Sequence, residues 1–163
     1  MKNALTATLC ITAAGLIMTG CVTTPRPSPP PPPPVDMLMD VASRATQELL
    51  KNPVVTGFEA KNKRKPLIEA GPVANATRAR IAIEQVSERV MDALLDSNQV
   101  DVMATNMTAD RPPDYFLDGL ILGQENTYTF QLRMNEVKTA TRAWGRSYTI
   151  RYDAPKGNWN IDL

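Results

Sequence analysis

The residues of this sequence that could carry out chemistry are mainly carboxylates at helical spacing. One set, with a carboxylate at every fourth residue, consists of Asp110, Asp114 and Asp118. On a helix this spacing would place all three carboxylates on one face, where they could bind a divalent cation. Pro112 and Pro113 interrupt this set, and proline breaks a helix interior, so we do not expect the three carboxylates to share a face. We therefore predict no metal site there.

A second acidic set has the same spacing without an intervening proline: Glu84, Glu88 and Asp92. The chain has no histidine, and so lacks the commonest general base and the commonest transition-metal ligand. Ser147 and Thr149 have no histidine base that would activate their hydroxyls. We interpret the acidic set as a solvated helix face, and predict a protein without catalytic residues or cofactors.

Cysteine occurs twice, as Cys10 and Cys21. Lys2 precedes an apolar stretch, residues 4–18, that carries no charge and ends near Cys21. A spanning helix needs about 20 apolar residues, and this shorter stretch is typical of a secretory signal peptide. The alternative is an uncleaved helix in the membrane interface. We predict a signal peptide over residues 1–20, whose removal also removes Cys10.

The residues before Cys21 resemble the lipobox of bacterial lipoproteins, with Gly20 as the small residue and Met18 where leucine is usual. The resemblance implies lipidation of Cys21. Each buried CH₂ of an acyl chain such as palmitate contributes about 0.8 kcal/mol, so three chains would anchor stably. Val22 stands in place of the aspartate that commonly retains lipoproteins in the inner membrane, which implies the periplasmic face of the outer membrane.

A proline-rich segment follows, and we assign residues 21–35 to the lipidated cysteine and a tether. Proline-rich chain extends by about 3.1 Å per residue as polyproline II, so this segment reaches about 45 Å. We interpret it as a spacer; the alternative is a proline motif that a partner binds. Loss of Lys2 with the signal peptide leaves 17 basic side chains against 17 acidic ones, so no net charge directs the protein to nucleic acid.

Two features are candidates for partner binding. The first is a basic stretch that consists of Lys61, Lys63, Arg64 and Lys65. It could contact an acidic protein surface or an anionic glycan, although a solvated loop would explain these residues as well. Trp159 lies in a polar C-terminal segment, where we expect it to be exposed and to form part of an interface.

Residues 36–163 have the length and composition of a single globular domain. We predict a helix over residues 37–51, with Asp36 as its N-cap, and a helix over residues 77–97 that ends at Asn98. Their apolar stripes are Leu38, Val41, Ala42, Ala45 and Leu49, and Ala79, Ile83, Val86, Val90 and Leu94. Residues 54–60 alternate as a strand, while residues 61–76 contain Pro66, Gly71 and Pro72 and are predicted to form a loop.

The C-terminal half is rich in strand patterns. We predict a short strand over residues 100–104, a strand over 115–122 that is buried on much of both faces, and a hairpin loop at 123–126. Strict alternation marks a strand over 127–134, and a turn at 138–141 leads to the last strand, with Trp144, Tyr148, Ile150 and Tyr152 on one face. The predicted fold is α+β, a mostly antiparallel or mixed sheet of about four to five strands with helices packed on one face.

Several of these segments resemble the LpoB family of outer-membrane lipoproteins: residues 48–55, 61–63, 97–98, 115–119, 128–132 and 142–144. The resemblance covers nearly all of residues 36–152. It implies a non-catalytic activator of a class A penicillin-binding protein, and so a regulator of peptidoglycan synthesis and cell shape. Residues 104–114 depart from it, since the family has an additional helix there, and the tether is short for the family.

Small lipoproteins with a similar domain also serve in secretion or polysaccharide-export assemblies. This resemblance implies the alternative function, a structural subunit that forms homo-oligomeric rings in the envelope.

Overall fold

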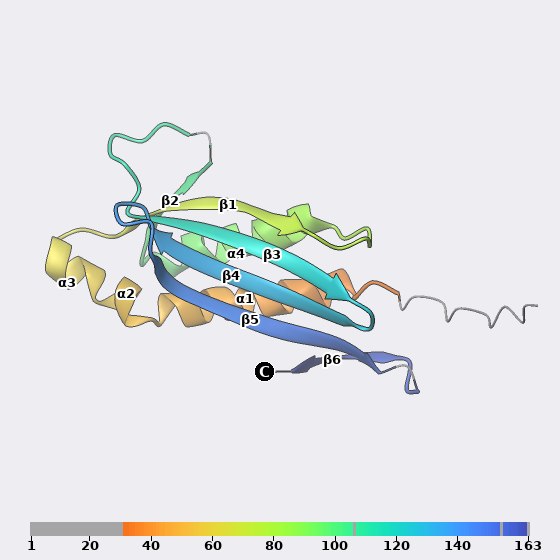
Figure 1. Ribbon diagram of the computed structural model, residues 1–163. Helices are drawn as coiled ribbons and strands as arrows, with labels where there is room; N and C mark the ends of the chain where they lie inside the picture. Colours follow the sequence, from red (N-terminus) through yellow and green to blue (C-terminus); the bar gives the residue numbers. More distant parts are fainter. Residues whose placement is uncertain (1–30, 106, 154, 163) are drawn as a thin grey trace, which may run out of the picture.

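The structure, a computed structural model, describes residues 31–105, 107–153 and 155–162. A six-stranded mixed sheet in the order β2-β1-β3-β4-β5-β6 is covered by helices on one face (Figure 1). The helices are α1 (Val35–Leu50), α2 (Pro53–Thr56), α3 (Phe58–Asn62) and α4 (Ile83–Ser97). The strands are β1 (Leu67–Asn75), β2 (Asp101–Ala104), β3 (Tyr115–Gln124), β4 (Thr127–Glu136), β5 (Arg142–Asp153) and β6 (Asn158–Asp162). The predicted fold class is correct, but the sheet has six strands rather than four to five.

The two long helices pack on each other and on the sheet, α1 against β4 and β5 and α4 against β1 and β2. All five predicted stripe residues of α1 are fully buried, and in α4 Val86, Val90 and Leu94 are buried. Helical periodicity predicted both helices because one apolar stripe has to face the sheet. None of the helices in the described residues is long and apolar enough to cross a membrane.

The predicted helix boundaries are less accurate. Pro34 rather than Asp36 occupies the N-cap of α1. Asp36 lies in the first turn, where its negative charge interacts favourably with the helix dipole. Helix α4 begins at Ile83 rather than at residue 77, because the Asn75 side chain accepts hydrogen bonds from both the backbone and the hydroxyl of Thr77 and holds a non-helical turn. Asn98 ends α4 as predicted, in the left-handed conformation at φ 52°.

The strand predicted at residues 54–60 is wrong, because this segment forms the short helices α2 and α3. The Asn52 side chain caps α2 by accepting a hydrogen bond from the Val54 N–H at 3.0 Å, and Pro53 occupies the first turn. Both residues favour helix initiation. Local capping therefore outweighs the alternating pattern.

The loop predicted at residues 61–76 is also wrong over its second half. Strand β1 occupies residues 67–75, between β2 and β3 and parallel to both. Its register against β3 shifts between Ala70 and Val73, which is where Gly71 and Pro72 lie. A bulge tolerates these two residues in an interior strand, so they did not mark a loop.

The antiparallel half of the sheet follows the alternating pattern. Strands β3 and β4 pair from Gln124↔Thr127 to Tyr115↔Glu136, around a two-residue turn in which Glu125 has φ 51°. Phe130, Leu132 and Met134 face the helices and are buried. Only one face of β3 is fully buried; Phe116 and Leu120 on the other face are half-buried because no helix covers that side (Figure 1).

Strand β6 was not predicted, since its sequence reads as a polar tail. It pairs antiparallel with β5, from Asp153↔Asn158 to Thr149↔Asp162. Its position brings Trp159 onto two aromatic rings, Tyr128 at 5.5 Å and Tyr152 at 4.9 Å between centroids. Trp159 is therefore half-buried at the sheet edge, not exposed in a tail.

Candidate functional site

A cleft of about 520 Å³ lies between α2–α3 and the adjoining ends of β3 and β4. We call it the α2–α3 cleft. Its cationic lining residues are Lys61, Arg64 and Lys138, and its aromatic ones are Phe58 and Tyr115. Asp114 and Glu136 supply carboxylates. The cleft therefore combines a basic rim with an apolar wall, a combination suited to an acidic or amphipathic ligand.

Arg64 is held in this cleft by two kinds of contact. Its guanidinium nitrogens donate to the Asp114 carboxylate at 2.5 Å and 2.7 Å. The same group stacks over the Phe58 ring, 5.2 Å from the centroid, and Phe58 meets Tyr115 edge-on at 5.8 Å. A planar guanidinium fits both a carboxylate and an aromatic face, so Arg64 is a fixed part of the cleft wall.

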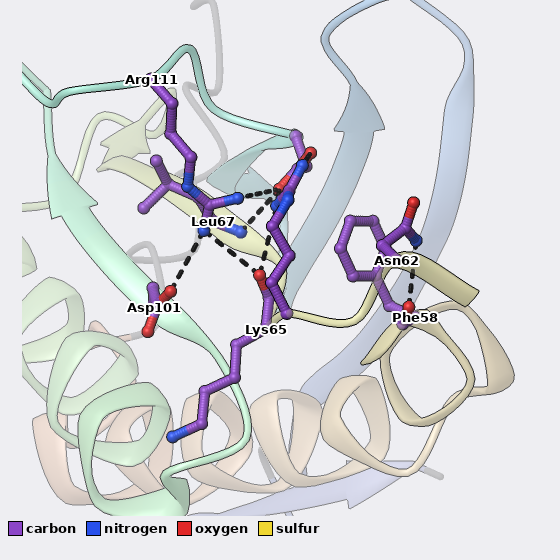
Figure 2. Close-up of polar contacts among 8 residues, drawn as sticks. Phe58, Asn62, Lys65, Leu67, Asp101 and Arg111 are labelled. Atoms are coloured by element: carbon purple, nitrogen blue, oxygen red, sulfur yellow. Dashed lines mark hydrogen bonds and ion pairs between the residues drawn. The ribbon is translucent and has the colours of Figure 1, made fainter. Parts of the chain in front are cut away.

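A second arginine joins the segments behind the cleft. Arg111 donates to the Lys65 carbonyl at 3.2 Å, and its guanidinium lies 3.1 Å from the Asp101 carboxylate (Figure 2). It also reaches the Asp114 carboxylate at 3.4 Å. These bonds tie the loop between β2 and β3 to β2 and to the chain that leads into β1.

The hydroxyl of Tyr115 is the titratable group most affected by this environment. Burial raises its pKa, and the nearby Glu136 and Asp114 carboxylates raise it further, because all three disfavour the phenolate. Tyr115 is therefore a neutral hydrogen-bonding group at physiological pH. Its hydroxyl can therefore both donate and accept a hydrogen bond in the cleft.

The structure brings together only some of the residues predicted to bind a partner. Lys61 and Arg64 line the cleft, and Lys63 is exposed at the end of α3, where it has φ 57°. Lys65 turns away and donates to the Asn98 side chain at 2.7 Å. Trp159 lies in β6, far from α3 (Figure 1).

The structure bears on the carboxylates considered as metal ligands but not on Cys21. Cys21 lies outside the described residues, so its lipidation stays a prediction. Of the carboxylates considered as metal ligands, Asp114 contacts Arg64, and Asp118 contacts Arg133 at 2.5 Å. No group of metal-ligating side chains occurs among the described residues.

Sequence reasoning missed Phe58, Tyr115 and Lys138 as members of the site, and it considered Asp114 only as a metal ligand. Phe58 was assigned to a strand, so its position beside Arg64 on a helix was not foreseen. Lys138 was placed in a turn, and nothing in its own segment indicates which cleft that turn borders.

Residues 38–112 match the family model described as peptidoglycan-synthase activator LpoB. The chain is LpoB-like. The matched segment of this LpoB-like protein runs from α1 through β2 and includes Arg64 and Arg111, while β3 to β6 lie beyond it.

Solved structures similar to this LpoB-like chain include two LpoB domains. The C-terminal domain of *Escherichia coli* LpoB is 15% identical, with 66% of this chain and 96% of that chain covered and a TM-score of 0.47. The C-terminal domain of Salmonella enterica LpoB is 13% identical, with 68% of this chain and 98% of that chain covered and a TM-score of 0.47. The chain of a PelC dodecamer from Paraburkholderia phytofirmans is 14% identical, with 52% of this chain and 68% of that chain covered and a TM-score of 0.40. A search of curated proteins found no match.

Proposed function

We propose that this LpoB-like protein is a non-catalytic lipoprotein that binds a periplasmic peptidoglycan synthase, a class A penicillin-binding protein, and raises its activity. The observation that carries the proposal is the match of residues 38–112 to the LpoB family model. The α2–α3 cleft supports it, because Lys61, Lys138 and the aromatic wall can contact an acidic surface of another protein.

The proposed location follows from the N-terminal sequence. Residues 1–20 act as a signal peptide, Cys21 carries the lipid anchor in the outer membrane, and residues 21–35 form the tether. Residues 36–163 act as one globular domain. Tether and domain together reach about 80 Å from the membrane, so the synthase has to extend toward the outer membrane to be bound.

The predicted basic residues divide into two roles in this proposal. Lys61 and Lys63 are exposed on or beside α3, where they can contact an acidic surface of the synthase. Arg64 and Lys65 hold the local structure through Asp114 and Asn98. Binding raises activity only if the protein binds the active conformation of the synthase more tightly than the inactive one.

The test uses the full-length acylated protein in detergent and a class A penicillin-binding protein from the same organism. We expect direct binding and a faster rate of glycan polymerisation. The double variant Lys61→Glu/Lys63→Glu should weaken binding about tenfold, as expected when two favourable contacts become repulsive. Lys156→Glu, an exposed lysine in the turn before β6, is the matched control and should bind normally.

A synthase that is neither bound nor accelerated by the protein would rule out the proposal. The mass of the protein in solution separates it from the alternative function. A stable ring of many copies would indicate the structural subunit of an envelope assembly instead.

A further inference from the structure

Strand β5 has an outer edge that is only half covered. On its inner side it pairs with β4 from Arg142 to Arg151. On its outer side β6 pairs with residues 149–153 only, and Figure 1 shows β6 beside the end of β5 alone. Within the part of the chain that the structure describes, residues 142–148 therefore have no strand on their outer side.

The backbone groups that point outward there can be identified. The Tyr152 N–H donates to the Asn126 carbonyl at 2.8 Å, on the β4 side of the strand. Backbone groups alternate in direction along a strand, so residues an odd number of positions from Tyr152 point to the outer edge. These are Gly145 and Ser147, and both are exposed. Their N–H and C=O groups are open to a further strand.

This open edge begins with an irregularity, because the pairing of β5 with β4 shifts between Arg142 and Trp144, but the pairing is regular from Trp144 onward. Residues 142–148 contain no proline and no acidic side chain, and Gly145 leaves the backbone accessible on its side. Proline, bulges and very short strands are common means of preventing edge pairing. The opposite edge of the sheet has such protection, because β2 spans only four residues.

Arginines flank the edge on both faces of the sheet. A Cβ built on Gly145 would lie 3.4 Å from the Arg142 Cδ, which places Arg142 over the face that no helix covers. Arg146 is paired with buried Leu132, so its side chain lies on the helix face, 3.2 Å from the Glu48 carboxylate and 63% exposed. A strand added here would have cations beside both rows of its side chains.

We propose that the outer edge of β5, at Gly145–Ser147, binds an extended acidic segment of a partner protein as an additional strand of the sheet. Main-chain hydrogen bonds give affinity in this mode of recognition and side-chain pockets give selectivity. A second copy of the chain is a poorer occupant, because antiparallel pairing of two β5 edges gathers two Arg142 and two Arg146 side chains along one seam. The proposal does not depend on the partner being a synthase.

The experiment uses the full-length acylated protein in detergent and a blocked nine-residue peptide of alternating valine and glutamate. A valine–lysine peptide of the same length is the control probe. We expect the acidic peptide to bind, the basic one not to bind, and the amide protons of Gly145 and Ser147 to exchange more slowly with deuterium in the complex. This exchange readout needs no variant.

Two sets of variants sharpen the test. Ser147→Pro removes an outward N–H and leaves the β4 side unchanged, so it should weaken peptide binding about tenfold, while Ser147→Ala keeps the N–H and should bind normally. Arg142→Glu/Arg146→Glu should exchange the preference between the two peptides. Arg151→Glu lies on the part of β5 that β6 covers, and it should leave the preference for the acidic peptide unchanged.

Three results would overturn the proposal. Binding of the acidic peptide without slower exchange at Gly145 and Ser147 would place it elsewhere, and so would equal binding of both peptides. Dimers in sedimentation that Ser147→Pro dissociates would identify a second copy as the occupant.

Discussion

The Arg64 guanidinium and the Asp114 carboxylate form a two-point ion pair that joins the chain after α3 to the start of β3, with nitrogen–oxygen distances of 2.5 Å and 2.7 Å. Asp114 also accepts a hydrogen bond from the Leu67 N–H at 2.9 Å. One carboxylate thus fixes the wall of the α2–α3 cleft and the beginning of β1.

We predict that Asp114→Asn lowers the free energy of unfolding by about 1–3 kcal/mol, because it breaks charge-assisted bonds and weakens the acceptor of the Leu67 N–H. Urea denaturation measures the change. Asp162→Asn is the matched control, since its pair with Arg151 is more than half exposed on both sides and should contribute less than about 1 kcal/mol. Equal effects of the two variants would contradict this role of Asp114.

Gly119 allows β1 and β3 to approach closely. A Cβ on Gly119 would lie 2.7 Å from the Val73 Cγ2, and Val73 is only 2% exposed. Gly119→Ala should therefore destabilise the protein by about 1–3 kcal/mol through overpacking. Adding Val73→Ala should recover part of that loss. Thermal denaturation of the unchanged protein, the two single variants and the double variant should therefore show that the two changes in stability are not additive. Gly145→Ala should change stability by less than about 0.5 kcal/mol, because its Cβ would lie 3.4 Å or more from every neighbour, the nearest being the flexible Arg142 side chain.

Tyr148 predicts a loss of stability at alkaline pH. Burial, and then the Glu48 carboxylate, raise its pKa to about 12, against about 10 in the unfolded chain. The raised pKa means that the folded state holds the proton more tightly, so this stability is complete below pH 10 and is lost as pH rises toward 12. The contribution is at most about 2–3 kcal/mol.

Tyr148→Phe should remove the loss of stability between pH 10 and pH 12 that is due to Tyr148. At pH 7 its stability should be unchanged or up to about 1 kcal/mol higher, because the hydroxyl has no hydrogen-bond partner among the described residues. Denaturation curves from pH 7 to pH 12 measure both effects. Tyr152→Phe is the control and should retain the alkaline loss due to Tyr148. A large loss at pH 7 in Tyr148→Phe would show that the hydroxyl is bonded after all.

Cys21→Ser should abolish incorporation of radiolabelled palmitate and release the protein from the outer-membrane fraction, because serine offers no thiol for the anchor. Cys10→Ser, within the predicted signal peptide, should be labelled and fractionate normally. Labelling that depends on Cys10, or on neither residue, would contradict the predicted lipoprotein processing.

Segments with a strong periodic pattern were predicted correctly because one face of each is buried in the core. The stripe from Leu38 to Leu49 repeats as a helix must, and Tyr128, Phe130, Leu132 and Met134 repeat as a strand must. Local chemistry also decided some ends, as at Asn98. The sequence by itself therefore determined α1, α4 and the hairpin strands, and it placed Lys61 and Arg64 beside each other.

Tertiary structure decided the remainder. Strand β1 contains Gly71 and Pro72 and forms because β2 and β3 satisfy its backbone on both sides. Strand β6 has little apolar pattern and depends on β5 and on the rings around Trp159. The partner of Arg64 lies 50 positions away at Asp114, and no local signal specifies a contact at that separation. Such pairings depend on which backbone edges and charges the packed core brings together, so they follow from the assembled sheet and not from any one segment.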